Sequence, residues 1–577
     1  MQLHAEFSRH QGDVRPLQIG SSLQLGGYPK TGFVTGGTLS ERTLFQNCSP
    51  RTTLRGKKPS RRLFDDNIVK RKSIQKSAAT VSTDLADERC PSGVEGLDDI
   101  LAGGLPRDCF YLVQGDPGSG KTTLALQFLL EGVRRGEKVF YITLSETKRE
   151  LLKVARSHGW SLDKIPVLDL SAVENLLRPE AQTTVFHPSE VELAKVSQLL
   201  LNEVRKARPS RVAFDSLSEF RLMAETSLRY RRQLLTLKQQ FTKFKSTVLL
   251  LDDKMDQRGV IDPHVLSLTH GVVDMEQLSP DYGTSRRRLR VAKLRAVKFR
   301  EGYHDYIIAT GGLRIFPRMI AAEHRGYFRN EPVSSGIKEL DILCGGGLDR
   351  GTTTLILGPV GTGKSTLALQ YAARMADQGD RCMIFTFDET RSVMLSRAKA
   401  LGFKLEKAIE SGTITVQQVD PAELSPGEFG VRILDGVKAG CKLVAIDSLN
   451  GYLNAMPGEK YLNNQLHELC SYLNQQGIVT ILILAQHGLA TAAEAPVDLS
   501  YLSDTVVSLR YFEAYGEVKQ AITVVKKRSG AHEKTIREFK LMSGKGIVIG
   551  EPLTQFEGVL TGVPIFRGSE KQIMKGR

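Results

Sequence analysis

The stretch that decides the fold is Gly358-Pro359-Val360-Gly361-Thr362-Gly363-Lys364-Ser365. Residues 352–357 before it are β-branched and apolar, which indicates a buried strand. Residues 366–372 after it are typical of a helix. A glycine loop between a strand and a helix matches the G-x-x-x-x-G-K-[ST] pattern, in which backbone N–H groups and the helix N-terminus cradle phosphate oxygens. The pattern predicts that Lys364 reaches the β- and γ-phosphates and that the Ser365 hydroxyl holds Mg²⁺.

The same element occurs a second time, 243 residues earlier, as Gly115-Asp116-Pro117-Gly118-Ser119-Gly120-Lys121-Thr122. Residues 92–93 (Ser-Gly) recur as residues 335–336, and residues 103–105 (Gly-Gly-Leu) recur as residues 346–348, at the same spacing. A constant offset of this length indicates a duplicated domain, because it is far too long for a solenoid repeat. The predicted nucleotide-binding residues of the two loops are Gly115, Gly118, Ser119, Gly120, Lys121, Thr122, Thr123, Gly358, Gly361, Thr362, Gly363, Lys364, Ser365 and Thr366.

Acidic residues follow a second apolar strand in each copy. Glu146 comes just after residues 138–144, and Asp388 and Glu389 follow residues 383–387. Because the carboxyl ends of parallel strands face the ligand crevice of an α/β sheet, these acids can orient or deprotonate an attacking water. The alternative is that they only cap the next helix, which would start at residue 147 or 390.

A further apolar strand in each copy ends in a single aspartate, Asp215 in the first and Asp447 in the second. A carboxylate at that position can order the Mg²⁺ shell opposite the phosphate loop. One aspartate after an apolar run is by itself weak evidence for a metal site. Its presence downstream of a phosphate loop in both copies predicts that Thr122 with Asp215, and Ser365 with Asp447, hold the metal.

Both copies then reach a β-rich segment with a Lys-x-Arg pattern. Alternation along a strand puts Lys293 and Arg295 on one face, and likewise Lys526 and Arg528. One interpretation is a solvated edge strand whose lysines deter aggregation. The other is a cationic pair aimed at a phosphate of a neighbouring subunit, with Arg528 in an arginine-finger role.

Composition limits the classes of protein. The net charge of +15 suggests nucleic-acid binding, but residues 1–80 hold 14 Lys+Arg against 5 Asp+Glu and so carry most of it. The longest apolar run, residues 478–485, is too short to span a bilayer, and the first residues have no apolar signal region. The seven cysteines form no C-x-x-C pair. We therefore expect a cytoplasmic protein without membrane contact, metal–thiolate site or disulfide framework.

These features predict four segments. Residues 1–85 form a basic tail without periodicity, which is either disordered, an electrostatic tether to nucleic acid or an acidic partner, or partly an artefact of an upstream start codon. Residues 86–320 and 321–566 form the two α/β domains, joined by a short ordered connector within 318–331. Residues 567–577 form a polar C-terminal tail.

With these motifs in hand, the chain resembles the KaiC family of double-domain RecA-like ATPases over residues 89–566. The resemblance implies two tandem RecA-like P-loop NTPase domains, each with a mostly parallel twisted sheet flanked by helices. It also implies a double-ring homohexamer with ATP and Mg²⁺ between neighbouring subunits, ATP hydrolysis in the first ring and, in clock members, Ser/Thr autokinase activity in the second. By motif, Lys293, Arg295, Lys526, Arg528 and His532 would reach across to the neighbour's ATP.

The sequence departs from the clock pattern in three places. The first of two adjacent glutamates in the first ring is Ser145 here, which leaves Glu146 alone, and the first-ring histidine falls on Phe299. The phosphorylation pair is replaced by Ser500 followed by tyrosine, with Ser503 as a second acceptor. A timekeeping phosphorylation cycle is therefore not expected, and the chain is more similar to the non-clock branch of the family, whose roles are in signalling.

Three hypotheses remain open from the sequence. The first is a signalling ATPase with autokinase activity on Ser500 or Ser503. The second is a RecA-like DNA-dependent ATPase, although the domains are only mildly basic and lack a basic loop with interleaved aromatics. The third is a nucleotide-gated scaffold with little turnover, which Ser145 favours for the first domain only.

Overall fold

A computed structural model describes residues 89–171, 188–224, 226–254, 263–279, 283–420, 422–454, 462–486, 500–560 and 564–568. The predicted basic tail and residues 569–577 of the predicted C-terminal tail lie outside these ranges. Within them, no helix has both the length and the apolar character needed to cross a membrane.

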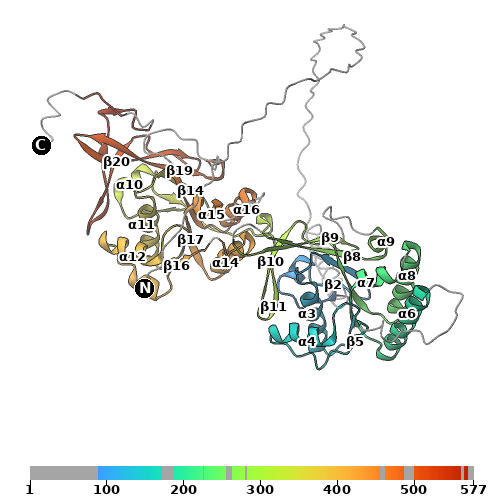
Figure 1. Ribbon diagram of the computed structural model, residues 1–577. Helices are drawn as coiled ribbons and strands as arrows, with labels where there is room; N and C mark the ends of the chain where they lie inside the picture. Colours follow the sequence, from blue (N-terminus) through green and yellow to red (C-terminus); the bar gives the residue numbers. More distant parts are fainter. Residues whose placement is uncertain are drawn as a thin grey trace, which may run out of the picture. The chain divides into compact units, whose positions relative to one another are not determined.

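The first domain, drawn in blue to yellow-green in Figure 1, is built on one large sheet. Within the described residues this sheet has nine strands in the order β11-β10-β9-β8-β3-β7-β6-β4-β5. Its strands are β3 (Phe110–Gly115), β4 (Val139–Thr143), β5 (Val167–Asp169), β6 (Arg211–Asp215), β7 (Thr247–Asp253), β8 (Gly271–Leu278), β9 (Arg286–Leu294), β10 (His304–Ala309) and β11 (Gly312–Phe316). Its helices are α2 (Leu97–Ile100), α3 (Lys121–Arg134), α4 (Lys148–Ser157), α6 (Pro188–Ala207), α7 (Leu217–Ala224), α8 (Ser227–Lys243) and α9 (Pro263–Leu268). A short ribbon pairs β1 (Arg89–Cys90) with β2 (Leu105–Pro106).

The second domain repeats this sheet in the order β16-β15-β17-β18-β14-β19-β20-β21-β22. Its strands are β14 (Thr353–Pro359), β15 (Arg381–Thr386), β16 (Ile414–Gln418), β17 (Cys441–Asp447), β18 (Val479–Gln486), β19 (Thr505–Ala514), β20 (Glu517–Lys527), β21 (Arg537–Met542) and β22 (Gly546–Pro552). Its helices are α10 (Lys338–Leu343), α11 (Lys364–Asp377), α12 (Arg391–Ala400), α13 (Glu406–Glu410), α14 (Pro426–Lys438), α15 (Leu449–Asn454) and α16 (Leu462–Gln475). Short ribbons pair β12 (Pro332–Val333) with β13 (Leu348–Asp349), and β23 (Phe556–Glu557) with β24 (Ile565–Phe566).

The two sheets have equivalent topology. In each, the strand before the phosphate loop pairs in parallel with both of its neighbours, β3 with β7 and β8, and β14 with β18 and β19. The strands beyond β8 and β19 run antiparallel. The predicted α/β fold with mostly parallel sheets is confirmed, and so is the duplication.

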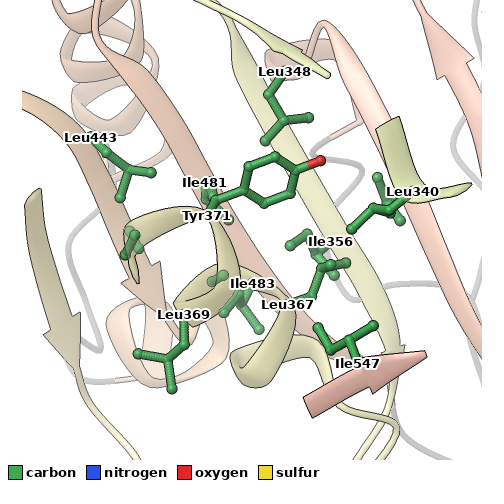
Figure 2. Close-up of a cluster of buried hydrophobic side chains, with 14 of the residues drawn as sticks. Leu340, Leu348, Ile356, Leu367, Leu369, Tyr371, Leu443, Ile481, Ile483 and Ile547 are labelled. Carbon is green, nitrogen blue, oxygen red and sulfur yellow. The ribbon is translucent and has the colours of Figure 1, made fainter. Parts of the chain in front are cut away.

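Both faces of the second sheet are buried, which explains the continuous apolar runs of its central strands. On one face Ile356, Ile481 and Ile483 pack with residues of α11, among them Leu367 and Tyr371 (Figure 2). The alternate residues of the same strands, such as Leu355 and Leu482, pack in a separate cluster on the other face. The sheet is therefore the middle layer between two sets of helices.

The connector between the domains is ordered, as predicted. It contains a 3₁₀ turn, η1 (Ala321–Glu323), and Ala321 is buried against α16. The side chain of Gln476 donates to the carbonyl of His324 at 2.7 Å, and the His324 ring packs edge-on against Tyr472.

A buried arginine ties the first phosphate-loop helix to the sheet. Arg211 begins β6 with a fully buried side chain that forms an ion pair with Glu137. Its guanidinium also donates to the carbonyls of Pro91 and Phe128 and lies 4.8 Å from the centre of the Phe128 ring. Removing Arg211 would take this donor from both carbonyls and leave Arg107, 2.8 Å away, as the remaining ion-pair partner of Glu137.

We expect Arg211→Ala to lower the free energy of unfolding of the first domain by about 3 kcal/mol, the low end of the effect of removing one partner of a buried ion pair, because Arg107 still pairs with Glu137. Trp160, the one tryptophan of the chain, lies in this domain, so its fluorescence during urea denaturation reports the transition. Arg205→Ala, at an exposed position of α6, is the matched control. Equal midpoints for the two variants would contradict the role of Arg211.

Candidate functional site

Each phosphate loop ends in a glycine that its geometry requires. Gly120 and Gly363 are the N-caps of α3 and α11, with φ angles of 91° and 94°. A Cβ at Gly120 would lie 2.6 Å from Cδ1 of Ile308, and one at Gly363 would lie 2.8 Å from Cε1 of Phe539. The left-handed backbone favours glycine at both positions, and a Cβ there would force the neighbouring side chain to shift. The loops therefore have the conformation that lets N–H groups converge on phosphate oxygens.

The two loop lysines differ in their partners. In the first domain, Lys121 Nζ donates to the carbonyls of Gly115 and Asp116 at 3.0 Å and forms an ion pair with Asp253 at 2.8 Å. In the second, Lys364 Nζ donates to the carbonyl of Pro359 at 2.7 Å. Burial lowers the pKa of Lys364 to about 8, because its surroundings disfavour the ammonium. Phosphate oxygens at this position would supply the missing negative charge.

The predicted metal-binding pairs are formed in both domains. Thr122 Oγ1 donates to the Asp215 carboxylate at 3.2 Å, and the Tyr141 hydroxyl donates to the same carboxylate at 2.6 Å. Burial raises the pKa of Asp215, while these two hydrogen bonds oppose the rise. Burial likewise raises the pKa of Asp447, against a hydrogen bond from Ser365. A hydroxyl and a buried carboxylate beside a phosphate loop are hard oxygen ligands that fit Mg²⁺.

The acids after the second strands do not cap helices, so that alternative is wrong. The N-caps of α4 and α12 are Thr147 and Thr390, whose own side chains accept hydrogen bonds from the first turn. In α4, Glu150 completes a capping box with Thr147. Glu146 is therefore not needed to stabilise the helix end.

Glu146 and Glu389 occupy matching places with different surroundings. The Glu146 Oε2 atom is buried without a hydrogen-bond partner among the described residues. Burial, followed by the charges of Asp215 and Glu150, raises the pKa of Glu146 to about 7. Glu389 instead forms an ion pair with Arg397 of α12 at 2.8 Å. Asp388, beside it, is exposed and accepts a hydrogen bond from the Ser448 hydroxyl.

Strand alternation does not describe the Lys-x-Arg patterns fully. Lys293 and Lys526 lie on β9 and β20, but Arg295 and Arg528 come just after these strands end, so the prediction that each pair shares one strand face is wrong. Lys526 Nζ donates to the carbonyl of Ser503 at 2.9 Å, and Arg528 lies 3.6 Å from Asp504, so both contact the segment before β19. Lys293 Nζ donates to the carbonyls of Leu266 and Thr269, before β8. Arg295 and Arg528 are exposed, and His532 is half-buried. Their predicted contact with a neighbouring subunit stays a prediction.

The predicted phosphorylation sites lie just before β19. Ser500 begins the 3₁₀ turn η2 (Ser500–Leu502), and Ser503 is fully buried. Phe299, at the place of the first-ring histidine, packs against the core. Gln486 ends β18, and its buried Oε1 atom has no hydrogen-bond partner among the described residues.

Sequence reasoning missed three residues of the sites. Tyr141 donates a hydrogen bond to Asp215. Arg397 forms an ion pair with Glu389, and Asp253 forms an ion pair with Lys121. Asp253 could have been found, because it also follows an apolar strand, just as Asp215 does. Tyr141 lies inside an apolar strand, and only the pairing of β4 with β6 brings it to Asp215.

Comparison with known proteins agrees with this geometry. The family model described as the KaiC ATPase matches residues 90–320 and again residues 333–554. The chain belongs to the KaiC family of ATPases. The two matches fall on the two sheets and include both phosphate loops, so each KaiC domain of this chain carries one complete candidate nucleotide site.

Curated relatives match most of the chain. It is 28% identical over 501 residues to the circadian clock protein KaiC3 of a Synechocystis species, covering 85% of this chain and 97% of that protein. It is 28% identical over 484 residues to the circadian clock oscillator protein KaiC of Synechococcus elongatus, covering 82% and 91%. It is 27% identical to the KaiC of Thermostichus vulcanus, covering 85% and 94%.

The raised pKa of Glu146 predicts pH-dependent turnover in the first KaiC domain. Below pH 7 the carboxyl is mostly protonated and cannot accept a proton from water, so phosphate release should rise about tenfold from pH 6 to pH 8. The measurement is made on the Lys364→Ala variant, which isolates the first site. Lys121→Ala controls for the titration of ATP itself, and Glu146→Gln should leave a low, flat profile. A flat profile with Glu146 intact would contradict the role of this residue as a base.

Proposed function

We propose that the protein is a Mg²⁺-dependent ATPase with two active nucleotide sites, and that the second site carries most of the turnover. The observation that carries this proposal is the common edge of β14, β15 and β17. β15 and β17 are neighbours, β18 lies between β17 and β14, and all four strands are parallel. β14, β15 and β17 lead into the phosphate loop, into Asp388 and Glu389, and into Asp447. Phosphate, metal and water ligands therefore share one edge.

The second site supports in-line hydrolysis because its residues can position the phosphates, the metal ion and the attacking water. Backbone N–H groups of the loop and Lys364 would hold the β- and γ-phosphates, and Ser365 with Asp447 would hold Mg²⁺, which neutralises charge on the phosphate oxygens. Glu389, oriented by Arg397, accepts the proton of the attacking water, and Asp388 helps to orient that water. The first site has the same phosphate loop and metal pair, but Ser145 replaces the first acid and Glu146 has no arginine partner among the described residues, so we expect it to turn over more slowly.

We further propose that the active form is a homohexamer with ATP at the subunit interfaces. Arg295 and Arg528 are exposed just beyond the ends of β9 and β20. Their guanidinium groups would reach a neighbour's phosphates together with Lys293, Lys526 and His532, with Arg528 leaving Asp504 and Lys526 leaving the carbonyl of Ser503. A nucleotide held in this way contacts two subunits, which links its binding to assembly.

The relatives named as circadian clock proteins suggest a role in signalling, with other proteins as partners. Autokinase activity would need a hydroxyl in line with the γ-phosphate and a nearby base. Ser503 is fully buried, so Ser500 is the better acceptor. Asp388 reaches less far than a glutamate, which favours water over a serine as acceptor, and we expect slow, partial labelling of Ser500.

Lys364→Ala should lower the release of free phosphate from ATP by about tenfold or more, because it removes a charged contact to the transferred group. Lys121→Ala should mainly weaken nucleotide binding. Incubation with γ-labelled ATP, with free phosphate and protein-bound label counted separately, measures hydrolysis and autokinase activity at once.

The opposite pattern, with Lys121→Ala inactive and Lys364→Ala active, would reverse the assignment of the two domains. Nucleotide binding without measurable phosphate release by the unsubstituted protein would instead indicate a nucleotide-gated scaffold. Stimulation of phosphate release by single-stranded DNA would favour the alternative of a DNA-dependent ATPase, for which the mildly basic domains give little support.

Assembly should depend on nucleotide. We expect hexamers in light scattering with ATP and Mg²⁺, and smaller species after both are removed, because ATP contributes contacts to two subunits. Arg528→Ala should shift the balance towards smaller species at equal ATP. Lys540→Ala, a charge change at an exposed position of β21, is the control. The same mass under all conditions would contradict this link.

A further inference from the structure

In the first nucleotide site, a carboxylate forms an ion pair with the lysine of the phosphate loop. Asp253 is the last residue of β7, and its Oδ1 atom lies 2.8 Å from Lys121 Nζ. The same ammonium donates to the carbonyls of Gly115 and Asp116, both at 3.0 Å. An ammonium has three N–H donors, so these three acceptors use all of them.

The second site lacks this carboxylate because of one difference in sequence. Gly115 pairs with Asp253 across β3 and β7, and the equivalent Gly358 pairs with Ala485 across β14 and β18. A methyl group therefore stands where the first site has an acid. Among the described residues, no carboxylate lies within ion-pair distance of Lys364.

Asp253 competes with phosphate for Lys121. The lysine of this loop type serves the β- and γ-phosphates, which carry the same sign of charge as the carboxylate. A bound nucleotide must therefore share the ammonium with Asp253 or displace it. The repulsion grows with each phosphate charge near the carboxylate, so a triphosphate is penalised more than a diphosphate.

The position of Asp253 allows a nucleotide to displace its side chain from Lys121. Its side chain is 46% exposed, whereas that of Lys121 is 11% exposed, so the carboxylate can turn to solvent while the lysine stays in the loop. The Asp253 backbone is held separately, because its N–H donates to the Ser218 hydroxyl and to the carboxylate of Asp252. The side chain can therefore move without disrupting β7.

We propose that Asp253 is a specificity-determining residue that shifts the first site towards ADP and away from ATP. This inference rests on the proposed function, since it assumes that both loops bind adenine nucleotides. The first domain would then respond to the ratio of the two nucleotides, while the second, with Ala485, would bind ATP without this penalty. The two rings would differ in nucleotide preference through one residue.

The test compares fluorescent ADP and a fluorescent, non-hydrolysable ATP analogue on the full chain with Mg²⁺. In a Lys364→Ala background, which reports the first site, Asp253→Asn should lower the Kd of the triphosphate about tenfold and change that of ADP less than about twofold. Asparagine keeps the shape and removes only the charge. An unchanged ratio of the two Kd values would overturn the proposal, and so would weaker triphosphate binding, which would show that Asp253 supports the metal.

The reverse substitution keeps the proposal testable if the first variant folds poorly. In a Lys121→Ala background, Ala485→Asp should raise the Kd of the triphosphate at the second site about tenfold, and Ala485→Asn, the neutral control, should not. Equal effects of the two substitutions would overturn the role of charge. A failure of the proposed function looks different: neither nucleotide would bind at either site.

Discussion

Parallel pairing of the strands around each phosphate loop is the constraint on which the rest of the structure depends. Parallel strands end at one edge, so the loop, the buried aspartate and the acid after the second strand meet there without any further folding signal. Parallel pairing also requires helices on both faces of the sheet, which is why the central strands are apolar throughout. One geometric requirement thus produces both the hydrophobic layers and the polar edge.

Burying the charged groups of the polar edge lowers the stability of the fold. Burial raises the pKa of Asp215, Asp447 and Glu146 and lowers that of Lys364, so each of these groups is held where its charged form is poorly solvated. Groups that a fold needs for its own stability are normally paired, as Arg211 is. Poorly solvated groups of both charge signs at one edge are instead the pattern expected where a charged ligand and a cation bind.

Much of the fold and of the site could be predicted because its signals are local. A glycine loop, an apolar run and the acid after it each occupy a few consecutive residues, and their repetition separated them from chance. The contacts that tune the sites were not predictable in this way. Tyr141 reaches Asp215 through the pairing of β4 with β6, and Asp253 reaches Lys121 through the pairing of β7 with β3. Such contacts depend on register, which a sequence pattern does not state.

Because the domain is duplicated, the contacts at the two nucleotide sites of one chain can be compared directly. The two sheets have equivalent strand order, so differences between the sites come from side chains and not from topology. Those differences lie at the polar edge: Ser145 stands in for an acid, and Asp253 is added beside Lys121. A residue in the core could not change in this manner without a cost in packing. The edge is therefore where two copies of one fold can acquire different nucleotide chemistry while both keep hydrophobic layers on the two faces of the sheet.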